Sequence, residues 1–353
     1  MEHSPAEYER LWLLVNALPQ GAALIDGNGN LLFANESFAK LTGIRHEDLI
    51  YGIPFPEDGL DLKLSQFIYQ ALKSEENLEL ELVVLKANQR NIFLAKSSRL
   101  ESKNTKELSL LVLFQDVTRV KHLEQMRQDF VSNVSHELRT PVTSIKGASE
   151  TLRDGALDNP VDARRFSDII FRQSERLSRI IEDLLSLSKI EKESDSNYIE
   201  FAEQDLYSIL LAASRNCEGR AQESGVSLKI PIPQTIRIRA NRTLLEQAIG
   251  NLIENAIEHS EKGSSVLLTV EQLQDSISIL VSDQGCGIAA EHLPRLFERF
   301  YRVDKSRSRK FGGTGLGLAI VKHVALAHRG EVSVTSVVGG GSRFKITLPN
   351  LLV

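Results

Sequence analysis

A histidine within the string SHELRTP is the first residue of this sequence whose setting points to chemistry. Phe130, Val134 and Leu138 recur at helical spacing around it, and at about 100° per residue they share one face of a helix. His136 then lies roughly 200° from the middle of that face, with Thr140 one turn further on. Because much of an imidazole is unprotonated at neutral pH, the pattern predicts an exposed nucleophile beside a hydroxyl group. On its own, such a histidine is more often a surface residue without a role.

Two asparagines on a second predicted helix, residues 243–259, are suited to holding a metal ion. Asn251 and Asn255 are one turn apart and therefore share a face of the helix. Two amide oxygens can bind a hard Mg²⁺ ion without adding much negative charge near a triphosphate. The pair alone would more simply be part of a polar face, so its meaning depends on the motifs that accompany it.

A carboxylate follows a strand-like segment, residues 276–283, in which apolar residues alternate. Asp283 is followed by Gly285 and Gly287, with Cys286 between them. The carboxylate can accept a hydrogen bond from an exocyclic amine, and the glycines let a ring approach the backbone. This combination predicts a corner that binds a nucleotide base. Cys286 is interpreted as a tolerated filler rather than as a redox switch.

A further glycine-rich string, GGTGLGL, comes directly before a predicted helix, residues 316–328. Flexible glycine amides at a helix N-terminus cradle phosphates. The string is not a Walker loop, because no Gly-Lys-Ser/Thr follows, and Leu318 stands where a dinucleotide fingerprint would have its last glycine. A structural loop is the competing interpretation, and it is the preferred one for the glycines at 339–341. The residues predicted to line a phosphate site are Gly313, Thr314, Gly315, Leu316 and Gly317.

The elements that must position these residues divide the chain of 353 residues into three parts, in keeping with roughly 150 residues per domain. Residues 1–119 predict a mixed α/β module that opens with a hairpin around a Gly/Asn turn at 27–30. Residues 120–192 carry two amphipathic helices separated by a Gly/Asn/Pro turn at 155–160, which predicts an antiparallel helical hairpin. Residues 198–353 predict a second α/β unit.

The predicted helical hairpin has more apolar surface than it can cover by itself. Pairing with a second copy into a four-helix bundle would bury both apolar stripes, so a homodimer is expected. The alternative is a monomeric hairpin that packs on the neighbouring domains.

Composition excludes several classes of function. The chain has 42 basic and 47 acidic residues and a net charge of −5, which argues against nucleic acid as the main partner. Its two cysteines, Cys217 and Cys286, give neither a disulfide framework nor zinc spacing. No apolar run approaches the length of about 20 residues that a transmembrane helix needs, and the acidic N-terminus is unlike a signal peptide. A cytoplasmic protein is therefore expected, either soluble as it stands or cut from a membrane anchor.

Several strings resemble those of known signalling families. DGNG and NESF near the start, with DVT at 116–118, resemble the early signature and the exit of PAS domains. SHELRTP resembles the phospho-accepting H box of bacterial sensor histidine kinases. The asparagine pair, Asp283 with its glycines, GGTGLGL and LFERFYR resemble the N box, the two glycine boxes and the F box of the GHKL ATP-binding fold. The whole chain is thus similar to PAS-containing sensor histidine kinases of the phosphate-regulon type.

This resemblance implies a fold and a reaction. The fold is multidomain α/β: an N-terminal PAS α/β sensor, an all-α hairpin that forms a dimeric four-helix bundle, and a C-terminal α/β-sandwich GHKL domain. His136 would accept the γ-phosphoryl group of ATP, and Glu137 would bond the other ring nitrogen. Thr140 would position water for hydrolysis of a phospho-aspartate. The implied partner is a response regulator receiver domain in a separate chain.

The resemblance also implies a nucleotide site that uses ATP and Mg²⁺. Asp283 would bind the adenine amine and Asn255 the Mg²⁺ ion, with Asn251 nearby, and a mobile lid would span residues 288–312. For the basic residues near the lid, phosphate contacts and structural salt bridges are equally open. Besides the glycine-rich string, the other residues placed at the ATP site are His259, Gly285, Gly287, Arg299, Arg302 and Lys305.

Two positions bear on the choice between reactions. Asn251 stands where water-activating ATPases of the superfamily have glutamate. An amide cannot act as a general base, which favours transfer to His136 over ATP hydrolysis. Glu258 replaces a lysine that often precedes the residue matching His259, which puts a phosphate contact from that side chain in doubt. The competing functions are a non-catalytic nucleotide-binding signalling scaffold and a chaperone-type ATPase.

The PAS-like module does not reveal its ligand. It contains no cysteine, so a flavin–cysteinyl photosensor is not expected. His46 in this module is expected on the surface rather than on a haem iron. The signal is expected to be intracellular, or to arrive through a partner or a membrane anchor.

Overall fold

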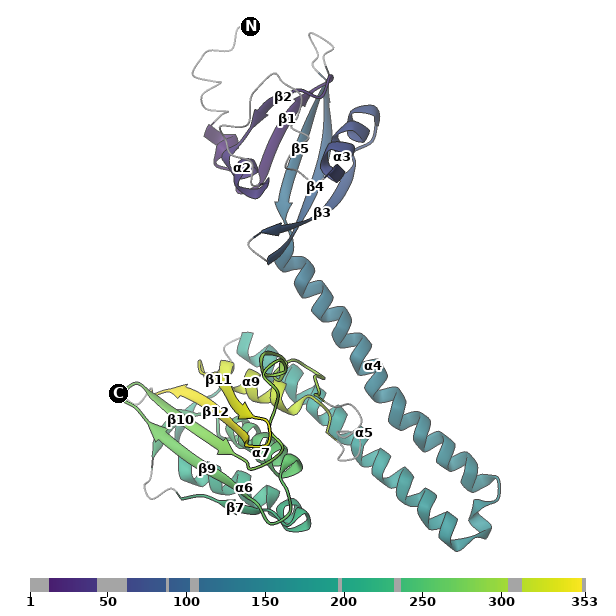
Figure 1. Ribbon diagram of the computed structural model, residues 1–353, viewed down its shortest axis with the longest axis vertical. Coiled ribbons are helices and arrows are strands. Elements are labelled where there is room, and N and C mark those ends of the chain that lie inside the picture. The colour runs from purple at the N-terminus through teal and green to yellow at the C-terminus, as the bar shows by residue number, and fades with distance from the viewer. Residues whose placement is uncertain are drawn as a thin grey trace. The chain divides into compact units, whose positions relative to one another are not determined.

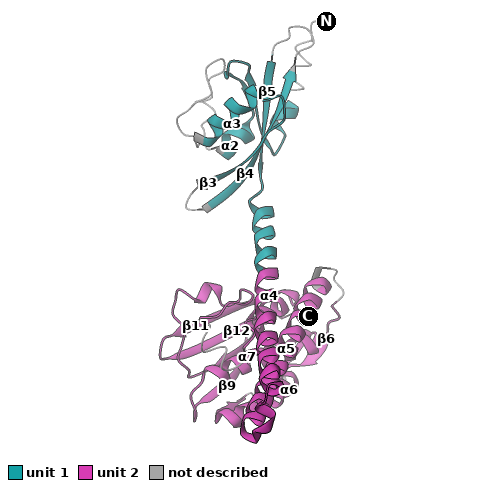
Figure 2. Cartoon of the chain, turned by 90° about the vertical axis from the view of Figure 1, so that its right-hand side faces the viewer, with its two compact units in different colours: residues 1–129 teal, residues 130–353 magenta. Residues whose placement is uncertain are grey.

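The computed structural model describes residues 13–42, 62–86, 89–101, 108–195, 199–231, 236–303 and 313–350. The chain forms two compact units, residues 1–129 and 130–353, which Figure 2 shows in separate colours. Among the described residues, no helix is both long enough and apolar enough to cross a membrane. His46, Lys305 and the rest of the predicted lid from 304 to 312 lie outside this part of the chain.

The first unit is built on one antiparallel sheet with the strand order β2-β1-β5-β4-β3 (Figure 1). The predicted hairpin is present, since β1 pairs antiparallel with β2. Its turn is stabilised by the Asp26 carboxylate, which accepts the N–H groups of Asn28 and Asn30 at 2.8 Å each. Gly29 completes the turn with a φ of 89°, which glycine adopts without strain. The elements are β1 (Gly21–Asp26), β2 (Leu31–Ala34), α2 (Glu36–Thr42), α3 (Leu62–Lys73), β3 (Glu79–Lys86), β4 (Gln89–Glu101) and β5 (Leu108–Asp116).

Asn35, the first residue of the NESF string, ties this unit together from a fully buried position. Its Oδ1 accepts the N–H groups of Ala22 and Phe38 at 2.9 and 2.8 Å. Its Nδ2 donates to the carbonyls of Val15 and Gln20, both at 2.9 Å. Because both the acceptor and the donor group are satisfied, burial of this amide costs little.

Two long helices, α4 (Thr118–Arg153) and α5 (Pro160–Asp195), form the predicted helical hairpin. They run antiparallel (Figure 1) and are joined by the short 3-10 turn η2 (Ala156–Asp158), where Gly155 has a φ of 126°. Helix α4 continues through Pro141. The chain therefore reverses after Gly155 and not at Pro141.

Apolar side chains remain exposed along both helices of the hairpin. Val131 and Val142 on α4 are 58% and 50% exposed, and Phe171 and Leu185 on α5 are 67% and 66% exposed. Large apolar side chains exposed along both helices favour a partner surface that covers them. They support the expected homodimer, which stays a prediction.

The rest of the second unit is an α/β layer structure. Its five-stranded sheet has the order β11-β12-β10-β9-β7, antiparallel except for the parallel pair of β7 with β9, and β6 pairs with β8 separately. Side chains of α6, α7, α9 and the sheet share one core. The elements are β6 (Ala202–Asp205), α6 (Leu206–Ser224), β7 (Ser227–Lys229), β8 (Arg237–Ala240), α7 (Arg242–His259), β9 (Ser265–Gln272), β10 (Ser276–Ser282), η3 (Leu293–Arg295), α9 (Gly317–Ala327), β11 (Glu331–Val337) and β12 (Gly341–Pro349).

Side-chain caps determine where two helices of this layer begin. Asp205 accepts the N–H of Ser208 at the start of α6, and Asn241 accepts the N–H of Leu244 at the start of α7. Such bonds satisfy amides that lack a partner in the first turn of a helix. Helix α9 has no side-chain cap bond at its N-cap residue Leu316. Its start is therefore suited to binding an anion.

Candidate phosphotransfer and nucleotide sites

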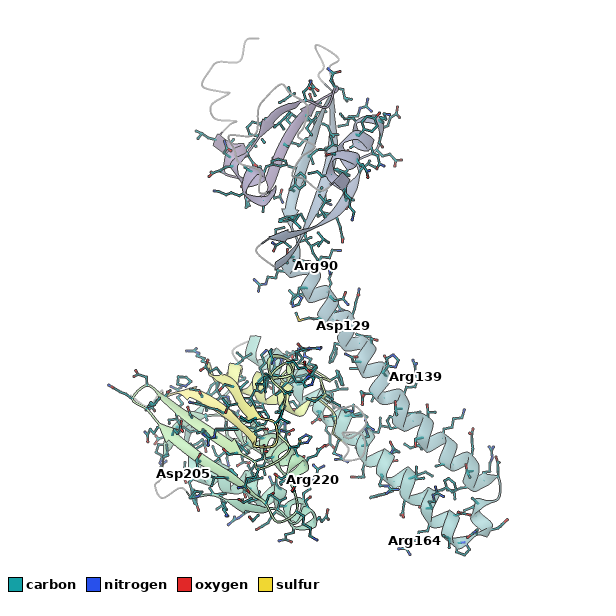
Figure 3. The ribbon with its side chains drawn as sticks, in the orientation of Figure 1. Arg90, Asp129, Arg139, Arg164, Asp205 and Arg220 are labelled. Carbon is teal, nitrogen blue, oxygen red and sulfur yellow. The ribbon has the colours of Figure 1, made fainter. Side chains whose placement is uncertain are left out.

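His136 is exposed on α4, whereas Phe130, Val134 and Leu138 are half-buried. Thr140 is exposed one turn further on, and its hydroxyl donates to the carbonyl of His136 at 3.1 Å. A surface pocket of about 390 Å³ lies beside the two side chains, so a phosphoryl donor or acceptor can approach the imidazole from solvent. The pocket is lined by His136, Arg139, Thr140, Thr143 and Ser144, and Figure 3 labels Arg139 on α4.

Glu137 points in a different direction from its neighbour His136, because successive residues of a helix are about 100° apart. Its Oε2 accepts hydrogen bonds from Arg176 on α5 at 2.9 Å and from Arg302 at 3.4 Å. Both arginines are nearly buried, with side chains 6% and 7% exposed. Among the described residues, the carboxylate is thus held by two guanidinium groups and is directed away from the imidazole ring.

Asp283 lies directly after β10 and is 8% exposed. Its Oδ1 accepts the N–H of Gly285 at 2.8 Å and the N–H of Ser342, at the start of β12, at 3.1 Å. Burial raises the pKa of this carboxyl above its ordinary value, and the two backbone bonds and His259 partly offset the shift. No hydrogen bond to its Oδ2 is found within the part of the chain described. That oxygen is placed to accept a hydrogen bond from a ligand.

Gly285 allows this corner to lie against the end of α7. A Cβ atom at that position would come closer than 3.0 Å to the carbonyl oxygen of His259, a contact that real side chains do not make. His259 itself is exposed at the last turn of α7. The glycine therefore brings the Asp283 corner and the helix that carries both asparagines together.

The two asparagines lie on one side of α7, where the glycine-rich string meets the helix. The Nδ2 of Asn251 donates to the carbonyl of Gly317 at 3.3 Å, and Asn255 is half-buried one turn further on. Binding through Nδ2 leaves the amide oxygen of Asn251 available, and amide oxygens suit hard cations. The residues present therefore fit a Mg²⁺ ion that arrives with a nucleotide.

The glycine-rich string forms the turn that leads into α9. Thr314 is 9% exposed, and its Oγ1 accepts the N–H of Leu316 at 3.1 Å. Gly315 has a φ of 74°, and its carbonyl accepts the N–H of Phe300 at 2.8 Å. A positive φ of this size favours glycine. The turn is therefore fixed by local bonds and by contact with the F-box string.

The two described basic residues of the F-box string make ion pairs with the hairpin. Arg299 pairs with Glu191 on α5, and the same carboxylate oxygen lies 3.2 Å from Nε2 of His323 on α9. Arg302 pairs with Glu137 and also donates to the carbonyl of Gly313. Both arginines make salt bridges in the structure, and their contact with phosphates stays a prediction.

Sequence reasoning missed the polar residues of α5 that contact these groups. Arg176, Asp183 and Glu191 lie on the same side of the helix as the buried Ile180 and Leu187, because the spacing is three, four or eight residues. Asp183 accepts the hydroxyl of Thr314 at 2.6 Å. Charged residues within an apolar stripe were the available signal. The part of Ser342 in holding Asp283 has no counterpart in the sequence pattern, because it acts through its backbone.

The fold and these sites define a class of protein in which an α/β module precedes a helical hairpin with an exposed histidine and an α/β layer, residues 199–350, called the ATP-binding layer below after the family that it matches. Residues 15–122 match the PAS fold family. Residues 126–193 match the His Kinase A (phospho-acceptor) domain. Residues 240–352 match the family described as histidine kinase-, DNA gyrase B- and HSP90-like ATPase.

Relatives along the whole chain identify the family. The sensor-like histidine kinase SenX3 of Mycolicibacterium smegmatis is 34% identical over 334 residues, which cover 94% of this chain and 83% of the relative. The sensor protein kinase WalK of Staphylococcus epidermidis is 32% identical over 98% of this chain and 56% of its own length. This chain belongs to the sensor histidine kinase family, and the PAS, helical and α/β ATP-binding parts expected from its sequence are confirmed.

A solved structure supports the fold alone. The histidine kinase ThkA, determined in complex with the response regulator protein TrrA, has a TM-score of 0.51 and 19% identity, covering 99% of this chain and 98% of that one.

Proposed function

We propose that this chain is an ATP-dependent protein-histidine kinase that phosphorylates His136 and passes the phosphoryl group to an aspartate of a response regulator in a separate chain. The observation that carries the proposal is the exposed imidazole of His136 beside a surface pocket. It lies in one compact unit with the Asp283 corner and the glycine-rich start of α9. Membership of the sensor histidine kinase family supports the same reaction.

In the first step, the unprotonated ring nitrogen of His136 attacks the γ-phosphorus of ATP. A nitrogen–phosphorus bond forms, the bond from the γ-phosphorus to the bridging oxygen breaks, and ADP leaves with that oxygen. A carboxylate that bonds the other ring nitrogen stabilises the positive charge on the ring, and Glu137 is the adjacent candidate. For this role Glu137 must first leave Arg176 and Arg302, with which it is paired in the structure.

The residues of the nucleotide site have separate tasks in this step. Asp283 would hold the adenine amine, and the start of α9 would hold phosphate oxygens. Mg²⁺, bound with ATP, supplies neutralisation of phosphate charge, and Asn255 would hold it with Asn251 nearby. Asn251 cannot activate water, so the γ-phosphoryl group is kept for the histidine.

In the second step, a carboxylate oxygen of the regulator's aspartate attacks the phosphorus, and the nitrogen–phosphorus bond breaks to restore His136. We also propose that Thr140 positions a water molecule for hydrolysis of the resulting phospho-aspartate. Its hydroxyl lies one turn from His136 on the exposed face of α4. The working unit is proposed to be a homodimer, because the apolar side chains along the hairpin are exposed in a single chain.

The first experiment follows label from γ-labelled ATP with Mg²⁺ into the full chain. The His136→Gln variant should lose acid-labile label, whereas the control His122→Gln, an exposed histidine on the same helix, should keep it. Label that persists in His136→Gln would contradict the assignment of His136. If the wild type and both variants bind ATP but none of them is labelled, the nucleotide-binding scaffold is the better description.

A second experiment concerns Thr140. A receiver domain phosphorylated by this chain should lose its phosphate more slowly with Thr140→Ala than with the wild type. The control is Thr151→Ala on the same helix, whose hydroxyl likewise bonds the carbonyl four residues earlier. Equal decay with Thr140→Ala and the wild type would show that the proposed phosphatase role is wrong.

A further inference from the structure

Asp183 is a partly buried carboxylate on α5 that has no task in the proposed reaction. Its Oδ2 accepts the hydroxyl of Thr314 at 2.6 Å. Burial raises the pKa of the Asp183 carboxyl, the bond from Thr314 lowers it, and the nearby carboxylates of Glu254 and Glu182 raise it further. Because burial removes part of the water around this carboxylate, its hydrogen bond from Thr314 has to replace that hydration.

Thr314 belongs to the turn that is expected to receive phosphates. Its Oγ1 accepts the N–H of Leu316, one residue before α9 begins, so the hydroxyl that Asp183 holds is part of an anion-binding helix start. A carboxylate and a phosphate are both anions and both seek the same donors. Bringing them to one hydroxyl in a partly buried place is unfavourable, because like charges repel strongly where water is scarce.

Two other carboxylates of the hairpin repeat this arrangement. Glu191 on α5 pairs with Arg299, and Glu137 on α4 pairs with Arg302, which also holds the carbonyl of Gly313. The hairpin therefore presents acidic side chains to donors of the ATP-binding layer at three separate points. Among the described residues of the hairpin, only Asp183 bonds a side chain of the glycine-rich turn.

We infer that Asp183 is an autoinhibitory latch that competes with the phosphates of ATP for Thr314, so that docking of α5 on the glycine-rich turn and binding of nucleotide oppose each other. The inference rests on the proposed function, because it requires ATP to bind at this turn. By thermodynamic reciprocity, ATP releases the hairpin by the same factor by which the docked hairpin weakens ATP binding. His136 is then carried on a hairpin that is freed when the substrate arrives.

The test measures ATP affinity of the full chain by calorimetry in the presence of Mg²⁺. Asp183→Asn keeps the shape and an acceptor for Thr314 but removes the charge, so it should bind ATP about five- to tenfold more tightly than the wild type, within the usual range of coupling between sites. The matched control is Glu182→Gln, which removes one negative charge from an adjacent exposed position. It should leave the affinity unchanged within about twofold.

A second measurement on the wild type needs no variant. Hydrogen exchange of the α5 segment 180–190, whose Leu187 and Ile190 are buried against the ATP-binding layer, should become faster when ATP is saturating. Equal affinities of Asp183→Asn and Glu182→Gln, or α5 exchange that ATP does not change, would overturn the latch while labelling of His136 still stood. A chain that binds no ATP at all would overturn the proposed function and the latch together.

Discussion

Substitution of Asp283 separates the structural role of this residue from its role in binding. The carboxylate accepts two backbone N–H groups, from Gly285 at 2.8 Å and Ser342 at 3.1 Å, in a place that is 8% exposed. Asp283→Ala strands both donors, and each unpaired buried donor costs about 1–3 kcal/mol. Because the substitution also removes a carboxylate whose pKa is raised by burial, we expect a net loss of roughly 2–4 kcal/mol in the free energy of unfolding.

Asp283→Asn should behave differently. The amide oxygen can replace Oδ1 toward Gly285 and Ser342, so the free energy of unfolding should change by less than about 1 kcal/mol. At the position of Oδ2, however, the variant places an NH₂ donor opposite the adenine amine, which is also a donor. Loss of a hydrogen bond to a charged group costs about 1.5–3 kcal/mol, which corresponds to roughly 10- to 150-fold weaker ATP binding.

The assays are ATP titration calorimetry and urea unfolding of the full chain. Inosine triphosphate is the matched ligand, because it has a carbonyl in place of the amine. The wild type should prefer ATP, and Asp283→Asn should narrow or reverse that preference. Binding of ATP by Asp283→Asn within twofold of the wild type would refute the assignment of the adenine amine to Asp283. Unchanged stability of Asp283→Ala would refute the account of the backbone bonds.

Three further predictions concern other contacts of the second unit. Burial lowers the pKa of His328, whose Nδ1 donates to the carbonyl of Val324 and whose Nε2 accepts the N–H of Asn241. The stability that this neutral histidine contributes is complete above the ordinary pKa of 6.5 and declines as the pH falls below it. In His328→Gln, the free energy of urea unfolding should therefore depend less on pH between about pH 7 and 5. Gly285→Ala should lose about 3 kcal/mol or more in thermal unfolding, because its methyl group meets backbone. In urea unfolding, Glu137→Gln should cost more stability than Arg176→Met, because it removes the one negative charge that two nearly buried arginines share, whereas Arg176→Met leaves Glu137 paired with Arg302.

Local features of the fold could be predicted from the sequence because local forces produce them. The Asp26 turn follows from side-chain bonds to the next few amides, and the chain reversal at Gly155 from a backbone angle that glycine adopts easily. The turn before α9 could be predicted for the same reason, because Gly315 has a positive φ of 74°, which glycine adopts easily. The parallel pairing of β7 with β9 could not be read in this way, because a three-residue strand has too few positions to show a period.

The candidate site was predictable only in part, because several of its contacts join distant segments. Glu137 was expected at the ring of His136, but its direction on α4 brings it to Arg176, 39 residues further along the chain. Asp183 and Glu191 stand out as charged residues within the apolar stripe of α5, but the stripe does not reveal which residues of the ATP-binding layer they contact. No spacing rule within one helix identifies a partner on another, so these pairs required the structure.

The strength of the contacts between the hairpin and the ATP-binding layer decides whether nucleotide can break them. The Glu191–Arg299 pair is about one-third exposed on both sides, and exposed or half-exposed pairs contribute about 0–1 kcal/mol each. Together with the bond from Thr314 to the charged Asp183, at about 1.5–3 kcal/mol, the two contacts contribute a few kcal/mol. Micromolar binding of ATP would supply about 8 kcal/mol. Partly hydrated carboxylates thus allow a contact that orders the resting hairpin and still yields to the substrate.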